Sequence, residues 1–334
     1  MPKNIVVCCD GTGNVYGERN TNVGYLYEAI ERGTPEQVVF YAAGVGTFGP
    51  FGWRFAKSLG KLLGSAFGYG LKQNLEQAYR FVMEHYEEGD RVYLFGFSRG
   101  AFTARSLAGM LRKCGLLYPR HDDQVTQASS TYLERDNADE ADAFKKRFCR
   151  ECKPWFVGVW DTVGSLGWLL ALRSFHDTQL NPDVTHGYHA VAIDERRRKF
   201  APSVWDETAL APHQNVQQMW FAGVHSDVGG GYPDRALGDI ALGWMLDAAA
   251  EYGLRVRPDA RAALQPDPLG KMHESYKGSW RLLGRHTRMI PDGARVHESV
   301  YERLKGDPEY RPTNLPRRSG PAEIPSLPGE ASPE

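Results

Sequence analysis

Ser98 is the residue of this chain with the clearest chemical potential. It stands in Gly96-Phe-Ser-Arg-Gly100, directly after the apolar run 91–97 and before a helical pattern over 101–111. A Gly-x-Ser-x-Gly segment between a strand and a helix is typical of a serine on a tight turn, its hydroxyl exposed above a parallel sheet. The glycines fit such a turn because strand and helix approach too closely for a Cβ. Nucleophilic attack by Ser98 is therefore predicted, and a buried serine at a structural turn is the alternative.

A nucleophilic serine needs a base, and the base needs an acid that orients it. Asp161 follows the apolar run 155–160, and His225 follows the apolar run 217–224. The order Ser98, Asp161, His225 is the chain order of α/β hydrolases. The glycines at 229–231 favour His225, because they let the backbone fold closely around a site.

A second acid and base pair also preserves this chain order. Asp227 would be the acid and His297, in Arg-Val-His-Glu-Ser-Val, the base. The sequence leaves this alternative open.

An acyl-transfer site also needs donors for a developing oxyanion. We expect the backbone N–H of Arg99, at the start of a helix, and one from Gly11 or Thr12 in the turn after the first strand. Asp10 would position that turn. Such a site requires no cofactor, and we predict no metal. The sequence leaves open a divalent cation bound by Asp10, Asp161 and Asp227 together.

Two apolar segments are candidates for contact with substrate. Residues 51–67 mix large apolar groups with Arg54, Lys57 and Lys61, as a lid or a lipid-facing element would. The alternative is a glycine-softened core helix. Residues 163–172 follow Asp161 and would form the wall of an acyl pocket or plain core. The substrate or lid candidates in these segments are Phe51, Trp53, Phe55 and Trp168.

The elements that would position these residues alternate along the chain. Strands are expected at 5–9, 37–42, 91–97, 155–160 and 217–224, and helices at 22–31, 71–85, 101–111 and 237–252, with a short helix at 186–194. This alternation predicts an α/β fold, an α/β-hydrolase-like doubly wound and mostly parallel sheet with helical insertions. The carboxyl ends of its strands share one edge, where Asp10, Ser98, Asp161 and His225 would meet.

Length and composition fit one large enzyme domain. The chain has 334 residues, of which 42% are hydrophobic. We expect a hydrolase-like domain over 1–304, with an insertion at 118–150, and a disordered proline-rich tail over 305–334. The 40 basic and 41 acidic residues give no reason to propose a nucleic-acid partner. The five cysteines suggest no disulfide framework, which favours a reducing compartment.

The N-terminus and the hydropathy pattern bear on location. Met1-Pro-Lys-Asn leads directly into a strand pattern without the apolar core of a signal peptide. No run of 18 apolar residues occurs that would span a membrane. We therefore expect synthesis in the cytoplasm, with any delivery elsewhere left to a secretion system.

Four ordered motifs, at 9–14, 96–105, 158–165 and 223–232, resemble a widespread α/β-hydrolase family that includes phospholipase effectors of bacterial type VI secretion. The likeness spans roughly residues 5–300. It implies a triad of Ser98, Asp161 and His225 and hydrolysis of phospholipid esters. It also implies a lipid or membrane-surface substrate and a secretion-apparatus or immunity-protein partner. This chain is shorter than the secreted effectors, so the chemistry transfers better than the delivery route.

These observations predict a serine acyl hydrolase that cleaves lipid esters through an acyl-enzyme, and the expected activity is that of a phospholipase. A soluble carboxylesterase or thioesterase is the alternative among enzymes. A non-catalytic binding module on the same fold is the alternative from another class. The sequence does not fix the head group, the positional selectivity or the oligomeric state.

Overall fold

A seven-stranded sheet forms the centre of the computed structural model, which describes residues 2–11, 14, 16–17, 20–44, 60–134, 136–163 and 180–316, with backbone alone for 60–69. The strand order is β2-β1-β3-β6-β7-β8-β9, and every neighbouring pair is parallel. The strands are β1 (Asn4–Cys9), β2 (Gln37–Ala42), β3 (Arg91–Phe97), β6 (Pro154–Trp160), β7 (His186–Ala192), β8 (Asn215–Phe221) and β9 (Arg295–Val296). The α/β fold with a mostly parallel sheet is thus confirmed.

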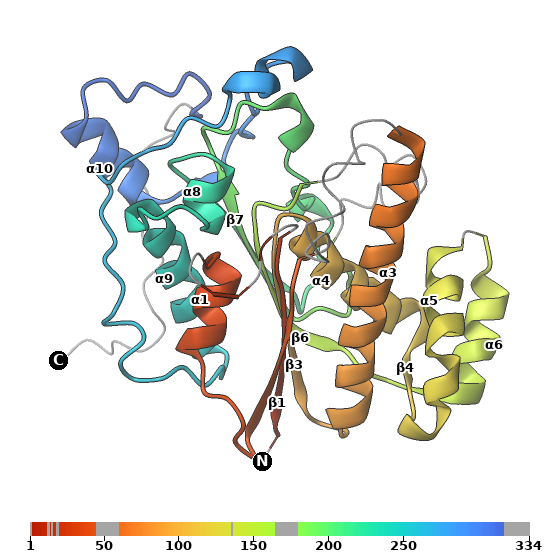
Figure 1. Ribbon diagram of the computed structural model, residues 1–334. Coiled ribbons are helices and arrows are strands. Elements are labelled where there is room, and N and C mark those ends of the chain that lie inside the picture. Colours follow the sequence, from red (N-terminus) through yellow and green to blue (C-terminus); the bar gives the residue numbers. More distant parts are fainter. Residues whose placement is uncertain are drawn as a thin grey trace.

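Helices cover both faces of this sheet, and they lie on either side of it in Figure 1. On one face are α1 (Asn22–Ala29), α8 (His225–Gly229) and α9 (Ala236–Glu251). On the other are α3 (Gly60–His85) and α4 (Arg99–Cys114). The helices predicted around 22–31, 71–85, 101–111 and 237–252 are confirmed, and α3 begins earlier than its periodicity indicated. No helix in the described ranges combines the length and apolar character needed to cross a bilayer.

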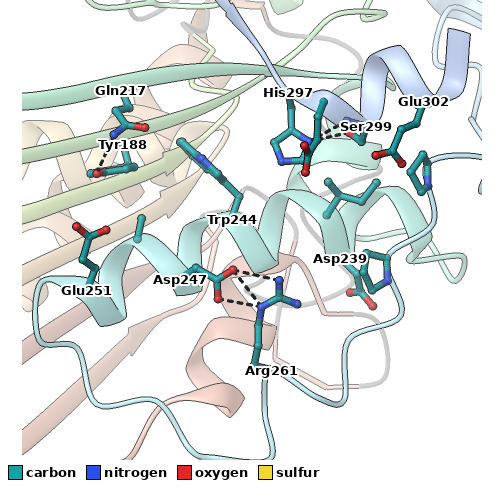
Figure 2. Close-up of a pocket in the computed structure, with 15 residues that line it drawn as sticks. Tyr188, Gln217, Asp239, Trp244, Asp247, Glu251, Arg261, His297, Ser299 and Glu302 are labelled. Atoms are coloured by element: carbon teal, nitrogen blue, oxygen red, sulfur yellow. Dashed lines mark hydrogen bonds and ion pairs between the residues drawn. The ribbon is translucent and has the colours of Figure 1, made fainter. Parts of the chain in front are cut away.

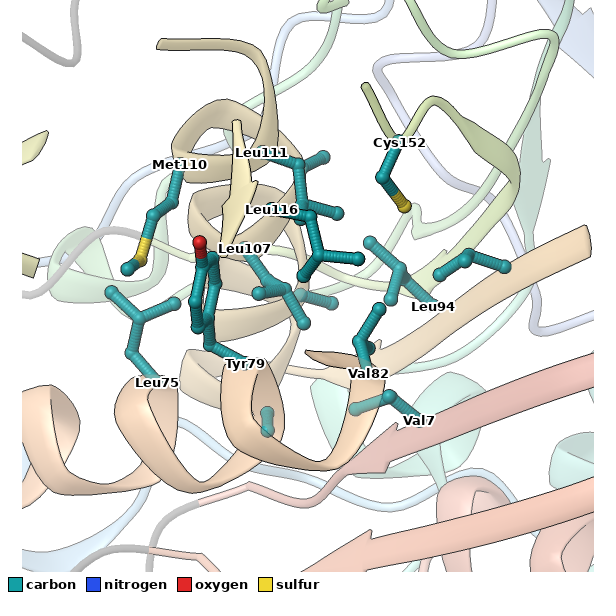
Figure 3. Close-up of a cluster of buried hydrophobic side chains, with 14 of the residues drawn as sticks. Val7, Leu75, Tyr79, Val82, Leu94, Leu107, Met110, Leu111, Leu116 and Cys152 are labelled. Carbon is teal, nitrogen blue, oxygen red and sulfur yellow. The ribbon is translucent and has the colours of Figure 1, made fainter. Parts of the chain in front are cut away.

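Each face of the sheet has its own apolar core, because successive residues of a strand point to opposite faces. Val7 of β1 and Leu94 of β3 pack with Leu75, Tyr79 and Leu107 of α3 and α4, as Figure 3 shows. The neighbouring residues of the same strands join the core beneath α1 and α9; these residues are Val6, Cys8, Tyr93 and Phe95. Both faces of the sheet are therefore buried, as the continuous apolar strands predicted.

The chain reverses its direction of winding at β1. It passes from β1 to β2 on one side and then returns to β3 on the other side of β1. In doubly wound sheets ligands bind beyond the carboxyl ends of the strands at such a reversal. Asp10 follows β1 and Ser98 follows β3, so the reversal lies where the sequence placed the site.

One predicted helix is wrong. Residues 186–194 were expected to form a short helix, but 186–192 form β7, whose residues are all buried. Strand β7 pairs with β6 on one side and β8 on the other. This pairing on both edges satisfies the backbone of β7, and such tertiary context outweighs local preference.

A group of short elements lies between α4 and β6, within the segment 118–150 predicted as an insertion. It contains a 3-10 turn, η1 (Pro119–Gln124), and two helices, α5 (Val125–Leu133) and α6 (Ala138–Phe148). It also includes β5 (Cys149–Arg150), which pairs with β4 (Leu116–Leu117) in a separate two-stranded sheet. Figure 1 shows α5 and α6 outside α3, away from the main sheet.

The packed part of the chain extends beyond residue 304, the boundary that the sequence predicted. Helix α10 spans Glu298–Gly306. Tyr310 is buried and donates a hydrogen bond to Asp194 Oδ2 at 3.0 Å. Asn314 Nδ2 donates to the carbonyls of Ile193 and Arg288. The start of the predicted tail is therefore part of the packed body, and residues 317–334 lie outside the described residues.

Candidate active site

The turn from β3 to α4 holds Ser98 in an unusual backbone conformation. Its φ of 57° and ψ of −119° are strained for a residue with a side chain. A Cβ on Gly96 would lie 2.5 Å from the Gly100 carbonyl oxygen, and a Cβ on Gly100 only 2.2 Å from the Cys9 carbonyl oxygen. Strand β1, strand β3 and helix α4 thus approach so closely that only glycine fits at both positions.

Three side chains from three strand ends meet in one hydrogen-bonded series. His225 Nε2 lies 2.9 Å from Ser98 Oγ, and His225 Nδ1 lies 2.5 Å from Asp161 Oδ2. Ser98 follows β3, Asp161 follows β6 and His225 follows β8. All three are buried, with Asp161 fully inaccessible. This is the spacing that a serine, a base and an orienting acid require.

The burial and charges of this series set its protonation. Burial lowers the pKa of His225 below its ordinary value, and the raising effect of Asp161 does not cancel it. Burial would raise the pKa of Asp161, but Arg288 and His225 outweigh it and hold that pKa well below its usual range. At neutral pH the imidazole is therefore neutral and the carboxylate charged, the states that a general base and its partner need.

Arg288 is a member of the site that the sequence did not reveal. It is 2% exposed, and its two terminal nitrogens donate to Asp161 Oδ1 at 2.5 Å and Oδ2 at 2.9 Å. The same nitrogens donate to the carbonyls of Ala192 and Phe200. A paired, hydrogen-bonded fork of this kind fixes a carboxylate in position. The sequence contains only an indirect sign of Arg288: a buried Asp161 needs a cationic partner, but no motif identifies which residue provides it.

Glu195 is a second side chain of the site that no sequence motif indicated. It is 1% exposed, and its Oε2 accepts the backbone N–H of His225 at 3.3 Å. Arg197 and the Ser275 hydroxyl donate to the same carboxylate. Glu195 therefore anchors the start of α8, and with it the position of the imidazole.

Aromatic rings enclose the His225 imidazole. The Phe97 ring centroid lies 4.6 Å from that of His225, and the Phe200 ring lies 4.9 Å away on an edge-on approach. A Cβ on Gly229 would stand 1.9 Å from the Phe97 ring. The glycine run thus lets the chain fold against this ring, as the sequence predicted.

The turn after β1 is held by Asp10. Its carboxylate accepts the N–H of Gly11 at 2.6 Å, the Thr21 hydroxyl at 2.8 Å and the Tyr41 hydroxyl at 2.5 Å. Asp10 therefore positions this turn as expected, but it also engages the Gly11 N–H that was a candidate oxyanion donor. Arg99 begins α4 directly after Ser98, and burial lowers the pKa of its guanidinium to about 10.

The alternative acid and base have other partners. The Asp227 carboxylate accepts a hydrogen bond from the backbone N–H of Val224. It also accepts hydrogen bonds from the backbone N–H and the ring Nδ1 of His273. His297 caps the start of α10 and contacts Ser299. In this structure neither residue is hydrogen-bonded to the other or to Ser98.

The three aspartates proposed for a cation also have separate partners. Asp10 binds the turn after β1, Asp161 binds Arg288 and His225, and Asp227 binds His273. Within the part of the chain that the structure describes, no three His, Cys, Asp or Glu side chains form a group suited to a metal ion.

Several predicted residues cannot be placed. Thr12, the second candidate oxyanion donor of the β1 turn, lies outside the described residues. So do the lid and pocket candidates Phe51, Trp53, Phe55 and Trp168. Their roles stay as predictions.

Two cavities lie in the part of the molecule that carries the site, and neither is lined by Ser98, Asp161 or His225. A groove of about 550 Å³ runs along α9, β8 and α10, and Figure 2 shows Trp244, Asp247 and His297 around it. Neither Ser98 nor His225 borders this groove. A smaller cavity of about 230 Å³ follows α4 from Phe102, one helical turn after Ser98, to Arg112. Its wall includes the apolar side chains of Val157, Leu180 and Trp205, and also the polar Arg105, Arg112 and Asn181.

The fold and site define the class of protein: an α/β-hydrolase-like chain with a serine on the turn after the third strand. Residues 3–248 match the family model of the type VI secretion phospholipase effector Tle1-like catalytic domain. The chain therefore belongs to this family.

Comparison with individual proteins gives more distant likenesses. The uncharacterised protein YEL023C of Saccharomyces cerevisiae is 40% identical over 218 residues, which cover 59% of this chain and 32% of the yeast protein.

Two solved structures are also similar. An uncharacterised protein from Pseudomonas aeruginosa aligns at 20% identity with a TM-score of 0.46, covering 78% of this chain and 47% of its own. The Tle1 effector bound to the VgrG spike of the type 6 secretion system aligns at 18% identity with a TM-score of 0.38, covering 70% and 52%. The chain thus spans a third to a half of the length of the relatives it matches.

Proposed function

We propose that this chain is a serine hydrolase that cleaves the carboxylic esters of phospholipids through an acyl-enzyme. The observation that carries the proposal is the contact of 2.9 Å between His225 Nε2 and Ser98 Oγ, with Asp161 on the other ring nitrogen. Membership of the Tle1-like phospholipase effector family supports phospholipid as the substrate.

In the proposed first step His225 Nε2 accepts the proton of Ser98 as Oγ attacks the ester carbonyl carbon. Asp161 accepts the hydrogen bond of Nδ1–H and stabilises the imidazolium that forms. The N–H of Arg99 and one from the β1 turn, for which Thr12 is the remaining candidate, would bind the oxyanion. Collapse of the tetrahedral intermediate expels the alcohol, which takes the proton from His225.

In the proposed second step water replaces the alcohol. His225 removes a proton from the water, which attacks the acyl-serine and releases the fatty acid, and Ser98 recovers its proton. The cavity along α4 is our candidate for the acyl chain, because it starts one turn from Ser98 and Val157, Leu180 and Trp205 form part of its wall. Its volume of about 230 Å³ exceeds the roughly 150 Å³ that suffices for a benzene-sized guest.

The delivery route is a further part of the proposal. The solved Tle1 effector is bound to a VgrG spike. By analogy we infer that this chain, alone or within a longer protein, is carried out of the cytoplasm by a secretion apparatus, with an immunity protein protecting the producing cell. Co-purification with the VgrG proteins of the source organism tests this inference, and failure to bind any of them would contradict it.

The first prediction tests the nucleophile. Ser98→Ala should lower release of fatty acid from phospholipid by about 10⁴-fold or more, because a triad acts as a unit. The matched control is Ser130→Ala, which removes a hydroxyl of α5 whose hydrogen-bond partner among the described residues is Lys72 Nζ.

Fluorophosphonate labelling extends this test. Label should attach to the native protein and to the Ser130 variant but not to Ser98→Ala. Retained hydrolysis in Ser98→Ala would contradict the proposed nucleophile. A labelled enzyme that cleaves soluble short-chain esters but no phospholipid would be a carboxylesterase, and an unlabelled, inactive native protein would be a binding module.

A further inference from the structure

Two surface segments form one patch beside the proposed active site, which we name the arginine–leucine surface: residues 196–200 and 277–289. Backbone hydrogen bonds join them, from His286 N to Arg196 O at 2.8 Å and from Arg198 N to Gly284 O at 3.2 Å. The Phe200 and Trp280 rings meet edge to face at 5.4 Å. The two segments therefore pack against each other as one surface.

Large apolar side chains of this surface point into solvent. Leu282 is 88% exposed, Met289 87% and Leu283 47%. Single exposed apolar residues are ordinary on protein surfaces. Here three stand within eight positions of one segment, two of them almost wholly uncovered, and a group of this kind marks a contact with a partner.

The charge of the same surface has one sign. Its exposed cations are Arg196, Arg198, Lys199, Lys277, Arg281 and Arg285. Within the described part of the chain none of these side chains forms an ion pair, whereas the half-buried Arg197 pairs with Glu195. Neither 196–200 nor 277–289 contains Asp or Glu. Since the whole chain has a net charge of −1, this local excess of positive charge is a feature of the surface alone.

The arginine–leucine surface adjoins the proposed active site. Phe200 touches both Trp280 of the surface and the imidazole of His225. Arg288, between the exposed Leu283 and Met289, turns inward to Asp161. In Figure 1 the short blue helix at the top is η5 (Gly278–Leu283), at the end of the molecule where the carboxyl ends of the strands lie.

We propose that the arginine–leucine surface docks the protein on an anionic phospholipid bilayer, with Leu282, Leu283 and Met289 inserted between the head groups. The proposal rests on the proposed phospholipase function and adds where and on which lipids it acts. Cations near an anionic leaflet and apolar side chains at its boundary attract a protein together. A nucleic acid would match the charge but would leave the leucines and the methionine in water.

Vesicle sedimentation tests the docking in the Ser98→Ala background, so that the lipids stay intact. The probes are vesicles of phosphatidylcholine alone and of phosphatidylcholine with phosphatidylglycerol. Binding should be stronger to the anionic vesicles and should weaken with added salt. Because each cation near such a surface contributes a factor of about five, Arg281→Glu with Arg285→Glu should lower binding at least tenfold.

Leu282→Asp with Leu283→Asp tests the apolar part, and should lower binding to anionic vesicles by a similar factor. Matched controls change two exposed cations and an exposed leucine elsewhere: Lys146→Glu with Arg147→Glu on α6, and Leu269→Asp, whose side chain is 52% exposed. The controls should bind as the parent does. Equal binding by the surface variants and the controls, or no binding to either kind of vesicle, would overturn the proposal.

Turnover separates this inference from the proposed function. In the native background the surface variants should lower the ratio of anionic-vesicle hydrolysis to hydrolysis of dispersed short-chain phospholipid by at least tenfold. An unchanged ratio would overturn the docking surface and leave the phospholipase intact. No hydrolysis of either substrate by the native protein would overturn the proposed function, while the sedimentation result would still stand. Fluorophosphonate labelling of Ser98 in each variant verifies that it has folded.

Discussion

At the scale of single residues, the proposed triad is one part of a larger polar cluster. Arg288 holds both oxygens of Asp161, and Glu195 holds the backbone of His225. A buried carboxylate without a partner would tend to take up a proton, so the guanidinium keeps Asp161 charged. Arg288 touches no reacting atom in the proposed mechanism and is therefore a positioning residue.

The second prediction concerns this positioning. Arg288→Gln should lower kcat/KM and cost about 3–5 kcal/mol of stability, because it leaves Asp161 buried without its cation. Burial is the main cause of the low pKa of His225, and Arg288 lowers it further. Its removal should therefore move the acid limb of the kcat/KM profile to higher pH. A pH profile and urea unfolding measure these effects.

Arg288→Lys provides the conservative comparison for that variant. It keeps the positive charge near the imidazole, so it should restore the position of the acid limb more than it restores kcat/KM, since lysine lacks the two-pronged contact. An acid limb at the same pH in all three proteins would contradict the electrostatic role of Arg288.

At the scale of elements, the sequence predicted those strands and turns whose formation depends on the local pattern of residues. Strands β1, β3 and β6 are continuous apolar runs between turn residues, and the Gly-x-Ser-x-Gly turn carries its own steric reason. The sequence pattern did not predict strand β7, because the strand contains two histidines that only the folded sheet accommodates. His189 bonds Thr162 N and Gln218, and His186 stacks on Tyr252 at 3.7 Å. The sequence pattern did not indicate Arg288 either, because its partner Asp161 is 127 residues away in sequence.

The third prediction tests the contact of β1 with α4. Gly100→Ala should lower the free energy of unfolding by about 1–3 kcal/mol or more, since overpacking displaces backbone and its Cβ would stand 2.2 Å from the Cys9 carbonyl oxygen. Urea unfolding measures the loss. Gly17→Ala is the control, because a Cβ there meets nothing within 4 Å. Equal stability of the two variants would show that the turn can relax without cost.

At the scale of the whole molecule, the proposed site extends beyond the part that matches the family. The match ends at residue 248, within α9. The later residues contribute Arg288 to Asp161, Ser275 to Glu195 and His273 to Asp227. They also complete the sheet with β9 and provide the arginine–leucine surface. Pattern within the matched region indicated Ser98, Asp161 and His225, the proposed nucleophile, acid and base, but not the groups that hold them.

The last prediction concerns the acid stability of the whole fold. Burial lowers the pKa of His186 to about 4 and of His189 to about 3, and it also lowers that of His225. In the unfolded chain each histidine takes up a proton near its ordinary pKa of 6.5, whereas in the folded protein it stays neutral at that pH. The contribution of these histidines to stability should therefore be constant above about pH 7 and fall as the pH drops below 6.5, by up to about 1.4 kcal/mol per pH unit for each such histidine.

Urea unfolding between pH 7.5 and 5 measures this slope. His189→Gln should flatten it, because glutamine keeps a polar group near Thr162 and Gln218 but takes up no proton. The matched control is His286→Gln, which makes the same change of residue type at an exposed position. If His189→Gln and the native protein lost stability equally between pH 7.5 and pH 5, burial would not be keeping His189 neutral in the fold. The same argument would then fail for His225, whose low pKa also has burial as its main cause.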